Sequence, residues 1–169
     1  MFYVELFRAL EKEGVRYLLV GGVAVTLHGA ERMTMDVDIM LALDTENLQR
    51  FRAAIRAFQL KPANPLVTME QFCDAATVET WIREKHMLAF QLRPTQGNGP
   101  SVDILVKPAV PFEHAYERRV MFKVEDLEVA VASAQDLIAL KSGTGRQIDR
   151  SDIEALRRLD MLRSRLRDD

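Results

Sequence analysis

Two aspartates separated by one residue, Asp36 and Asp38, follow the pair Gly21-Gly22 across thirteen intervening residues, and this spacing constrains the fold more than any other feature. Residues 16–20 before the glycines are apolar and rich in strand formers, whereas residues 23–29 after them have the pattern of a short buried helix. Glycine lets the backbone approach a ligand closely, and the first turn of a helix presents unpaired N–H groups. A strand, a glycine turn and a helix in this order predict an anion-binding turn suited to a phosphate chain.

The segment 34–41 places both acids on one side of a predicted strand, because residues two apart in a strand face the same way. Two such carboxylates can approach to about 4 Å, where their repulsion is about 4 kcal/mol at an effective dielectric near 20. Protonation of one carboxylate or binding of a divalent cation would relieve that repulsion. Because hard oxygen ligands in small number suit Mg²⁺ bound to substrate phosphates, we interpret the pair as a Mg²⁺ site.

A third carboxylate, Asp103, is the only charged residue in the apolar segment 101–106. The segments 87–92 and 102–106 flank a glycine- and proline-containing turn at 97–100, and this predicts an antiparallel hairpin that returns Asp103 beside the first acidic strand. Three aspartates beside a phosphate-binding turn can hold metal ions that activate an attacking oxygen and stabilise a leaving pyrophosphate. The pattern therefore predicts metal-dependent nucleotidyl transfer.

The chain resembles the polymerase-beta-like nucleotidyltransferases, and within them the minimal bacterial branch near the AbiEii-type toxins. The motifs that carry the likeness are Gly21-Gly22, Arg32-x-Thr34-x-Asp36-x-Asp38, Asp103, the segment 136–141, Gly145-Arg146 and Asp149-x-x-Asp152. The resemblance covers most of the sequence.

The resemblance implies a role for each residue that matches the family's motifs. The glycines would contact the triphosphate of an NTP substrate, with Arg32 and Thr34 in the same nucleotide-binding motif. Lys141 would steady the phosphates, and Asp103 would help to deprotonate the acceptor hydroxyl. The residues implied to bind Mg²⁺ are Asp36, Asp38 and Asp103.

The sequence departs from that family at two positions. Many relatives carry serine after the first glycine, whereas this chain has Gly22, and the toxin-like branch tends to have a lysine where Ile148 stands. A hydrogen bond to a charged phosphate contributes about 1.5–3 kcal/mol, so we expect the missing hydroxyl to slow the reaction by about one or two decades.

The resemblance implies transfer of a nucleoside monophosphate to a hydroxyl of tRNA or of a protein, by a toxin that has an antitoxin partner. Two alternatives remain open: a module of the same fold that binds a nucleotide or a partner without catalysis, and a transferase that modifies a small molecule such as an aminoglycoside.

The net charge of −2 and the isoelectric point near 6.0 provide no overall attraction to nucleic acid, so any contact with RNA would be local.

The length of 169 residues and the hydrophobic content of 48% predict one domain spanning 1–169, with a helical C-terminal segment from about residue 133. The single cysteine, Cys73, and the absence of an apolar stretch of about 18 residues predict a cytoplasmic protein with no membrane contact.

We expect an α/β (α+β) fold of the nucleotidyltransferase type, with a mixed, largely antiparallel central sheet and helices packed mainly on one face. The expected strands are 16–20, 34–41, 87–92, 102–106, 120–124 and 127–131. The expected helices are 2–13, 23–29, 44–59, 68–86 with a break near residue 75, 111–119, one from 133 to Gly143, and one from about 149.

Overall fold

The computed structural model describes residues 1–168, and its centre is a seven-stranded sheet in the order β3-β4-β5-β2-β1-β7-β6. Neighbouring strands run antiparallel except for the pairs β1–β7 and β2–β5, which are parallel. The predicted mixed, largely antiparallel sheet is therefore confirmed. The strands are β1 (Tyr17–Val20), β2 (Val37–Leu41), β3 (Leu60–Pro62), β4 (Ala89–Pro94), β5 (Val102–Leu105), β6 (Val120–Val124) and β7 (Leu127–Val131).

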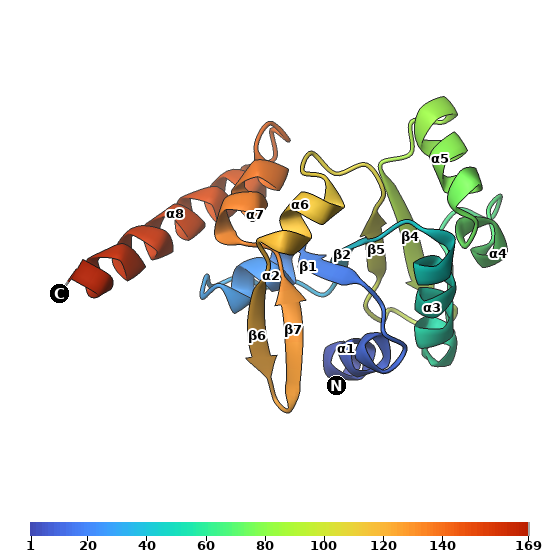
Figure 1. Ribbon diagram of the computed structural model, residues 1–169, viewed down its shortest axis with the longest axis horizontal. Coiled ribbons are helices and arrows are strands. Elements are labelled where there is room, and N and C mark those ends of the chain that lie inside the picture. The colour runs from blue at the N-terminus through green and yellow to red at the C-terminus, as the bar shows by residue number, and fades with distance from the viewer. Residues whose placement is uncertain (169) are drawn as a thin grey trace.

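Helices surround this sheet, and Figure 1 shows the last and longest of them extending away from the body of the molecule. The helices are α1 (Phe2–Lys12), α2 (Gly21–Leu27), α3 (Thr45–Ile55) with the 3₁₀ turn η1 (Arg56–Phe58), α4 (Met69–Phe72), α5 (Ala75–Glu84), α6 (Phe112–Glu117), α7 (Ala134–Lys141) and α8 (Gln147–Asp168). No helix within residues 1–168 is both long and apolar enough to span a membrane.

Polar side chains at the helix N-termini explain where several helices begin. Asp44 accepts a hydrogen bond from the backbone N–H of Asn47 at the start of α3, and Ser133 accepts one from Asp136 at the start of α7. The helix expected over 68–86 with a break near residue 75 is the two helices α4 and α5, so the expected break is confirmed. Its break follows from Asp74, whose carboxylate caps α5 by accepting from the backbone N–H of Thr77.

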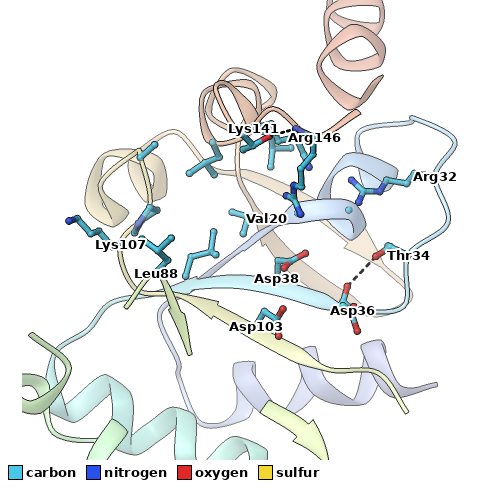
Figure 2. A pocket seen from close by; sticks show the side chains of 18 residues that line it. Val20, Arg32, Thr34, Asp36, Asp38, Leu88, Asp103, Lys107, Lys141 and Arg146 are labelled. Atoms are coloured by element: carbon cyan, nitrogen blue, oxygen red, sulfur yellow. Dashed lines mark hydrogen bonds between the residues drawn. The ribbon is translucent and has the colours of Figure 1, made fainter. Parts of the chain in front are cut away.

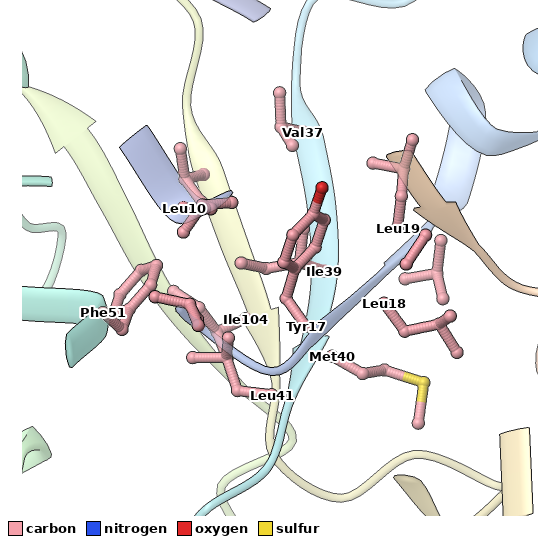
Figure 3. Packing of buried hydrophobic residues seen from close by; sticks show 14 of the residues in the cluster. Leu10, Tyr17, Leu18, Leu19, Val37, Ile39, Met40, Leu41, Phe51 and Ile104 are labelled. Carbon is pink, nitrogen blue, oxygen red and sulfur yellow. The ribbon is translucent and has the colours of Figure 1, made fainter. Parts of the chain in front are cut away.

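The main core lies between one face of the sheet and the helices α1 and α3 (Figure 3). Alternate residues of neighbouring strands form this layer, including Tyr17, Ile39 and Ile104, while Leu10 of α1 and Phe51 of α3 pack in the same cluster. Burial of apolar side chains on this scale supplies the main driving force for folding. The core face also fixes which residues point to the opposite face.

The opposite face is covered at the centre of the sheet and open toward β4. All four residues of β1 are buried, which requires packing on both faces, and α2 contacts β1 and β2 from this side. At the centre of the sheet, both faces are therefore covered, whereas we expected the helices to pack mainly on one face. In β4 burial alternates instead: Phe90 and Leu92 are buried, whereas Gln91 between them is exposed. Residues of β4 and β5 that face away from the core are therefore accessible.

Two segments differ from their predicted structure in ways that affect the site. The strand expected over 34–41 begins only at Val37, so Asp36 precedes it in a segment without regular structure. The short edge strand β3 was not expected, because Pro62 breaks the strand pattern; proline is tolerated in edge strands, where one side has no partner.

Candidate active site

A cavity of about 500 Å³ lies above the sheet where β2 and β5 meet α2, α7 and the segment after α7 (Figure 2). Residues far apart in the sequence meet here because β2 pairs with β1 on one side and with β5 on the other. The cavity is lined by every residue that the sequence nominated for the site: Gly21, Gly22, Arg32, Thr34, Asp36, Asp38, Asp103 and Lys141.

Asp38 is the most perturbed carboxylate of the cavity. It stands opposite Asp103 in the parallel register of β2 and β5, so the two side chains leave the sheet on the same face. The pKa of Asp38 is raised to about 6, first by burial and then by the negative charge of Asp103, while Lys141 acts in the opposite direction. The site therefore concentrates negative charge where solvent is scarce.

Asp103 has one oxygen that is satisfied and one that is not. Its Oδ2 accepts a hydrogen bond from Nε2 of Gln91 at 3.1 Å, whereas its buried Oδ1 has no hydrogen-bond partner among the described residues. Burial raises the pKa of Asp103, and the guanidinium of Arg93, 3.8 Å from Oδ1, opposes that shift. A buried acceptor without a partner is unfavourable unless a ligand, a metal ion or a proton occupies it.

Asp36 is turned toward β5 and its loop. Its Oδ1 accepts hydrogen bonds from Oγ of Ser101 at 2.5 Å and from the backbone N–H of Ser101 at 3.3 Å, and Arg93 lies 4.0 Å away. Since Asp36 precedes β2, it does not share the strand geometry of Asp38. Within residues 1–168, no three His, Cys, Asp or Glu side chains converge as a group that could hold a metal ion.

The residues nevertheless fit a divalent cation in their donor chemistry. The Asp38 carboxylate with its raised pKa and the unpartnered Oδ1 of Asp103 are hard oxygen donors in register on adjacent strands. Mg²⁺ prefers such oxygens, and it commonly takes only one or two protein carboxylates together with phosphate oxygens.

The glycine turn between β1 and α2 brings the backbone against Asp38. Gly21 has a φ of +67°, a conformation that residues with a Cβ rarely adopt, and a Cβ there would lie 2.6 Å from that of Asp38. The nearby backbone N–H of Gly22 acts to lower the pKa of the Asp38 carboxyl. Glycine at 21 is thus required both by the backbone conformation and by the close approach of Asp38.

The basic side of the cavity is an ion-pair network anchored on α8. Lys141, only 7% exposed, contacts Asp149 at 3.1 Å and Asp152 at 2.8 Å. Asp149 also accepts from Nε of Arg146 at 2.7 Å, and Asp152 accepts from Nη1 of Arg32. Lys141 therefore lies in the cavity wall as predicted from the sequence, but two aspartates of the next helix hold its ammonium.

The sequence did not identify the side chains that contact Asp36 and Asp103, namely Gln91, Arg93 and Ser101. The period-two alternation of the hairpin contains the missing signal: Gln91 is the register partner of Asp103, and Arg93, two residues later, shares its face. The apolar wall of the cavity was also not foreseen. It consists of Val20, Leu88, Leu105, Pro108, Ala109, Leu137 and Leu140.

The arrangement supports chemistry on a phosphate chain that carries an apolar group. A glycine turn exposes backbone close to the acids, cationic side chains border one side, and an apolar wall borders the other. The carboxylate of Asp103, whose pKa is raised by burial, accepts a proton more readily than an ordinary aspartate.

Comparison with known proteins places this chain in a family. The model of the family described as "Nucleotidyl transferase AbiEii toxin, Type IV TA system" matches residues 5–143. No curated protein sequence matches the chain.

Three solved structures share the fold. The lincosamide antibiotic adenylyltransferase LnuA, bound to lincomycin, is 18% identical with a TM-score of 0.60, and the match covers 94% of each chain. ANT(2″)-Ia in complex with adenylyl-2″-tobramycin is 11% identical with a TM-score of 0.54, over 99% of this chain and 95% of that one. An antigenic nucleotidyltransferase-like protein from Paracoccidioides brasiliensis is 18% identical with a TM-score of 0.52, over 91% and 73%.

Proposed function

The chain belongs to the AbiEii nucleotidyl transferase toxin family, and from this premise we propose that it moves a nucleoside monophosphate from an NTP to a hydroxyl group at the acidic cavity. The observation that carries the proposal is the register of Asp38 and Asp103 beside the glycine turn, in a cavity that also contains cationic side chains. This combination meets the needs of phosphoryl chemistry, which depends mainly on positioning and on stabilising negative charge.

In the proposed reaction the acceptor oxygen forms a bond to the α-phosphorus of the NTP. The bond from that phosphorus to the oxygen bridging to the β-phosphate breaks, and pyrophosphate leaves. The proton of the acceptor hydroxyl passes to the Asp103 carboxylate, whose raised pKa suits a general base. The triphosphate lies on the side of Asp38 that faces away from Asp103. It is bound there by Gly21, Gly22 and Thr34 and by the basic side chains of Arg32 and Lys141.

We further propose that Asp36, Asp38 and Asp103 hold Mg²⁺. The cation supplies positive charge that offsets the carboxylate repulsion and polarises the phosphate. Asp38 and Asp103 lie in register for this role, and Asp36 would join them by giving up its hydrogen bonds to Ser101. Arg93, which lies near both Asp36 and Asp103, stabilises these two acids when no metal ion is bound.

For the acceptor we propose a hydroxyl of tRNA or of a protein, in a toxin whose activity an antitoxin partner counteracts. The support for this biological role is the family description, which names a toxin of a type IV toxin–antitoxin system. The rival acceptor is a small molecule. It is favoured by the neighbours LnuA, solved with lincomycin, and ANT(2″)-Ia, solved with adenylyl-2″-tobramycin, each of which matches nearly the whole chain.

The test is to incubate the protein with each α-labelled NTP, Mg²⁺ and separated fractions of tRNA, total protein, lincosamides and aminoglycosides. We expect label in the tRNA or protein fraction together with release of pyrophosphate, and loss of both in Asp38→Ala. Label in a drug fraction would establish the rival acceptor. Nucleotide binding without transfer to any fraction would identify a non-catalytic module and refute the proposed activity.

A further inference from the structure

Gly22 lies directly beneath the guanidinium of Arg32. The φ angle of Gly22 is outside the left-handed region, so its backbone conformation would accept any residue. The neighbouring side chains would not: a Cβ at this residue would lie 3.0 Å from both Nε and Cζ of Arg32, and 3.0 Å from Cβ of Thr34. These contacts are closer than normal packing between side chains allows. Glycine at 22 therefore makes room for Arg32.

Arg32 is held in this place by one end of its guanidinium and lacks a partner at the other. Its Nη1 donates to the buried carboxylate of Asp152 on α8, whereas its Nε is buried and has no hydrogen-bond acceptor within residues 1–168. A buried N–H without an acceptor is unfavourable, and proteins rarely keep one without a reason. This donor lies on Gly22, in the wall of the acidic cavity.

We propose that Arg32, seated on Gly22, donates from its guanidinium to the terminal phosphates of the nucleotide, and that glycine is required at 22 to keep it there. The inference rests on the proposed function, since it assumes that the cavity binds a triphosphate. A guanidinium is planar and always charged, and it presents N–H groups that match the spacing of two phosphate oxygens.

The ion-pair network that contains Arg32 has a net positive charge, which favours the binding of an anion. Asp152 contacts both Arg32 and Lys141, while Asp149 contacts Lys141 and Arg146. Three cations are thus joined by two carboxylates, so that one positive charge of the network remains for a phosphate. Asp152 acts as the positioning residue, because it fixes Nη1 and so holds the guanidinium over Gly22.

This arrangement reverses the expected effect of a hydroxyl at residue 22. In a phosphate-binding turn with no arginine above it, a serine side chain adds a hydrogen-bond donor and strengthens phosphate binding. Here it would displace Arg32, which is flexible and can move, so the fold would persist while a charge-assisted contact is lost. We expect Gly22→Ser to weaken binding of the nonhydrolysable NTP analogues by about tenfold, and Arg32→Ala to weaken it by about 10- to 100-fold.

The experiment is a double-mutant cycle with four proteins: wild type, Gly22→Ser, Arg32→Ala and the double variant. Dissociation constants are measured for nonhydrolysable analogues of ATP, GTP, CTP and UTP and for the four NMPs, alongside the melting temperature. We expect the serine to weaken binding only when Arg32 is present, and to leave the double variant equal to or tighter than Arg32→Ala. Both single variants should lose the preference for NTP over NMP, which a general loosening of the fold would not change selectively.

Two matched controls accompany the cycle. Arg83→Ala removes an exposed cation on α5, and Gly99→Ser adds a hydroxyl at the other glycine of residues 1–168 whose φ is outside the left-handed region. Neither residue lines the cavity, so both variants should bind like wild type. Tighter NTP binding in Gly22→Ser, or unchanged binding in Arg32→Ala, would overturn the inference and leave the proposed function intact. Failure of the wild type to bind any NTP would instead refute the proposed function, and the inference with it.

Discussion

Replacing Asp38 by asparagine is expected to stabilise the protein in the absence of metal ions while removing its activity. The side chain is half-buried beside Asp103, and its pKa is raised from 3.8 to about 6 in the folded state. Asparagine has nearly the same shape, carries no charge, and keeps an oxygen that can accept a hydrogen bond. The substitution therefore removes mainly the unfavourable free energy of a buried anion.

The size of this stabilisation follows from the difference between the pKa values of Asp38 in the folded and unfolded states. Because the folded pKa is above the unfolded one, the folded state binds the proton more tightly, and ionisation of Asp38 lowers stability as the pH rises. The contribution of Asp38 is fully favourable below about pH 4 and is lost as the pH rises through about 6. At about 1.36 kcal/mol per pKa unit, Asp38→Asn should gain about 3 kcal/mol at pH 8, about 1.6 kcal/mol at pH 5 and about 0.6 kcal/mol at pH 4.

The assay is urea denaturation of wild type and Asp38→Asn in EDTA at these three pH values. Asp160→Asn, at an exposed position of α8, serves as the control and should change stability by less than about 0.5 kcal/mol at each pH. Added Mg²⁺ should stabilise the wild type and leave Asp38→Asn unchanged, because the cation requires the carboxylate. A stability difference independent of pH, or a less stable Asp38→Asn protein at pH 8, would refute the buried-anion reasoning.

Three further substitutions test the surroundings of the site. Gly21→Ala forces a Cβ into a left-handed conformation against Asp38, and we expect at least about a tenfold loss of NTP affinity in a binding titration; wild-type affinity would contradict the close approach. Lys141→Met leaves two buried aspartates of α8 with fewer cations, and should cost about 3 kcal/mol in urea unfolding, whereas a change below about 1 kcal/mol would mean that the network contributes little. Leu156→Ala opens a cavity where α8 packs on the body and should cost about 3 kcal/mol by the same method, with a smaller cost indicating that α8 is loosely attached.

The sequence predicted most of the strands, and it nominated residues that meet in one cavity, where local chemistry decides the structure. The glycine pair, the alternation around Asp38 and the hairpin that returns Asp103 each carry a short-range signal, and the structure brings all three to one cavity. The paired strands β6 and β7 have the predicted bounds, because the acidic turn at 125 and 126 separates two alternating segments.

What the sequence could not predict depends on contacts between distant residues. Asp36 leaves the strand because Ser101, 65 residues later, holds its carboxylate, and no local pattern reveals that partner. The ammonium of Lys141 is held by two acids of α8, a pairing that arises only when α7 and α8 pack together. Along α8, Leu156 is 1% exposed and Leu166 is 78% exposed, because the helix extends beyond the sheet, and the sequence does not reveal where that packing ends.

The most direct test of the acidic centre is a crystal structure with Mn²⁺ and a nonhydrolysable NTP analogue, with the metal located by its anomalous signal. We expect a Mn²⁺ peak within coordination distance of the carboxylates of Asp38 and Asp103, with the triphosphate along Gly21 and Gly22. A metal ion bound elsewhere, or a triphosphate that lies away from the glycine turn, would contradict the assignment of this cavity as the site of nucleotidyl transfer.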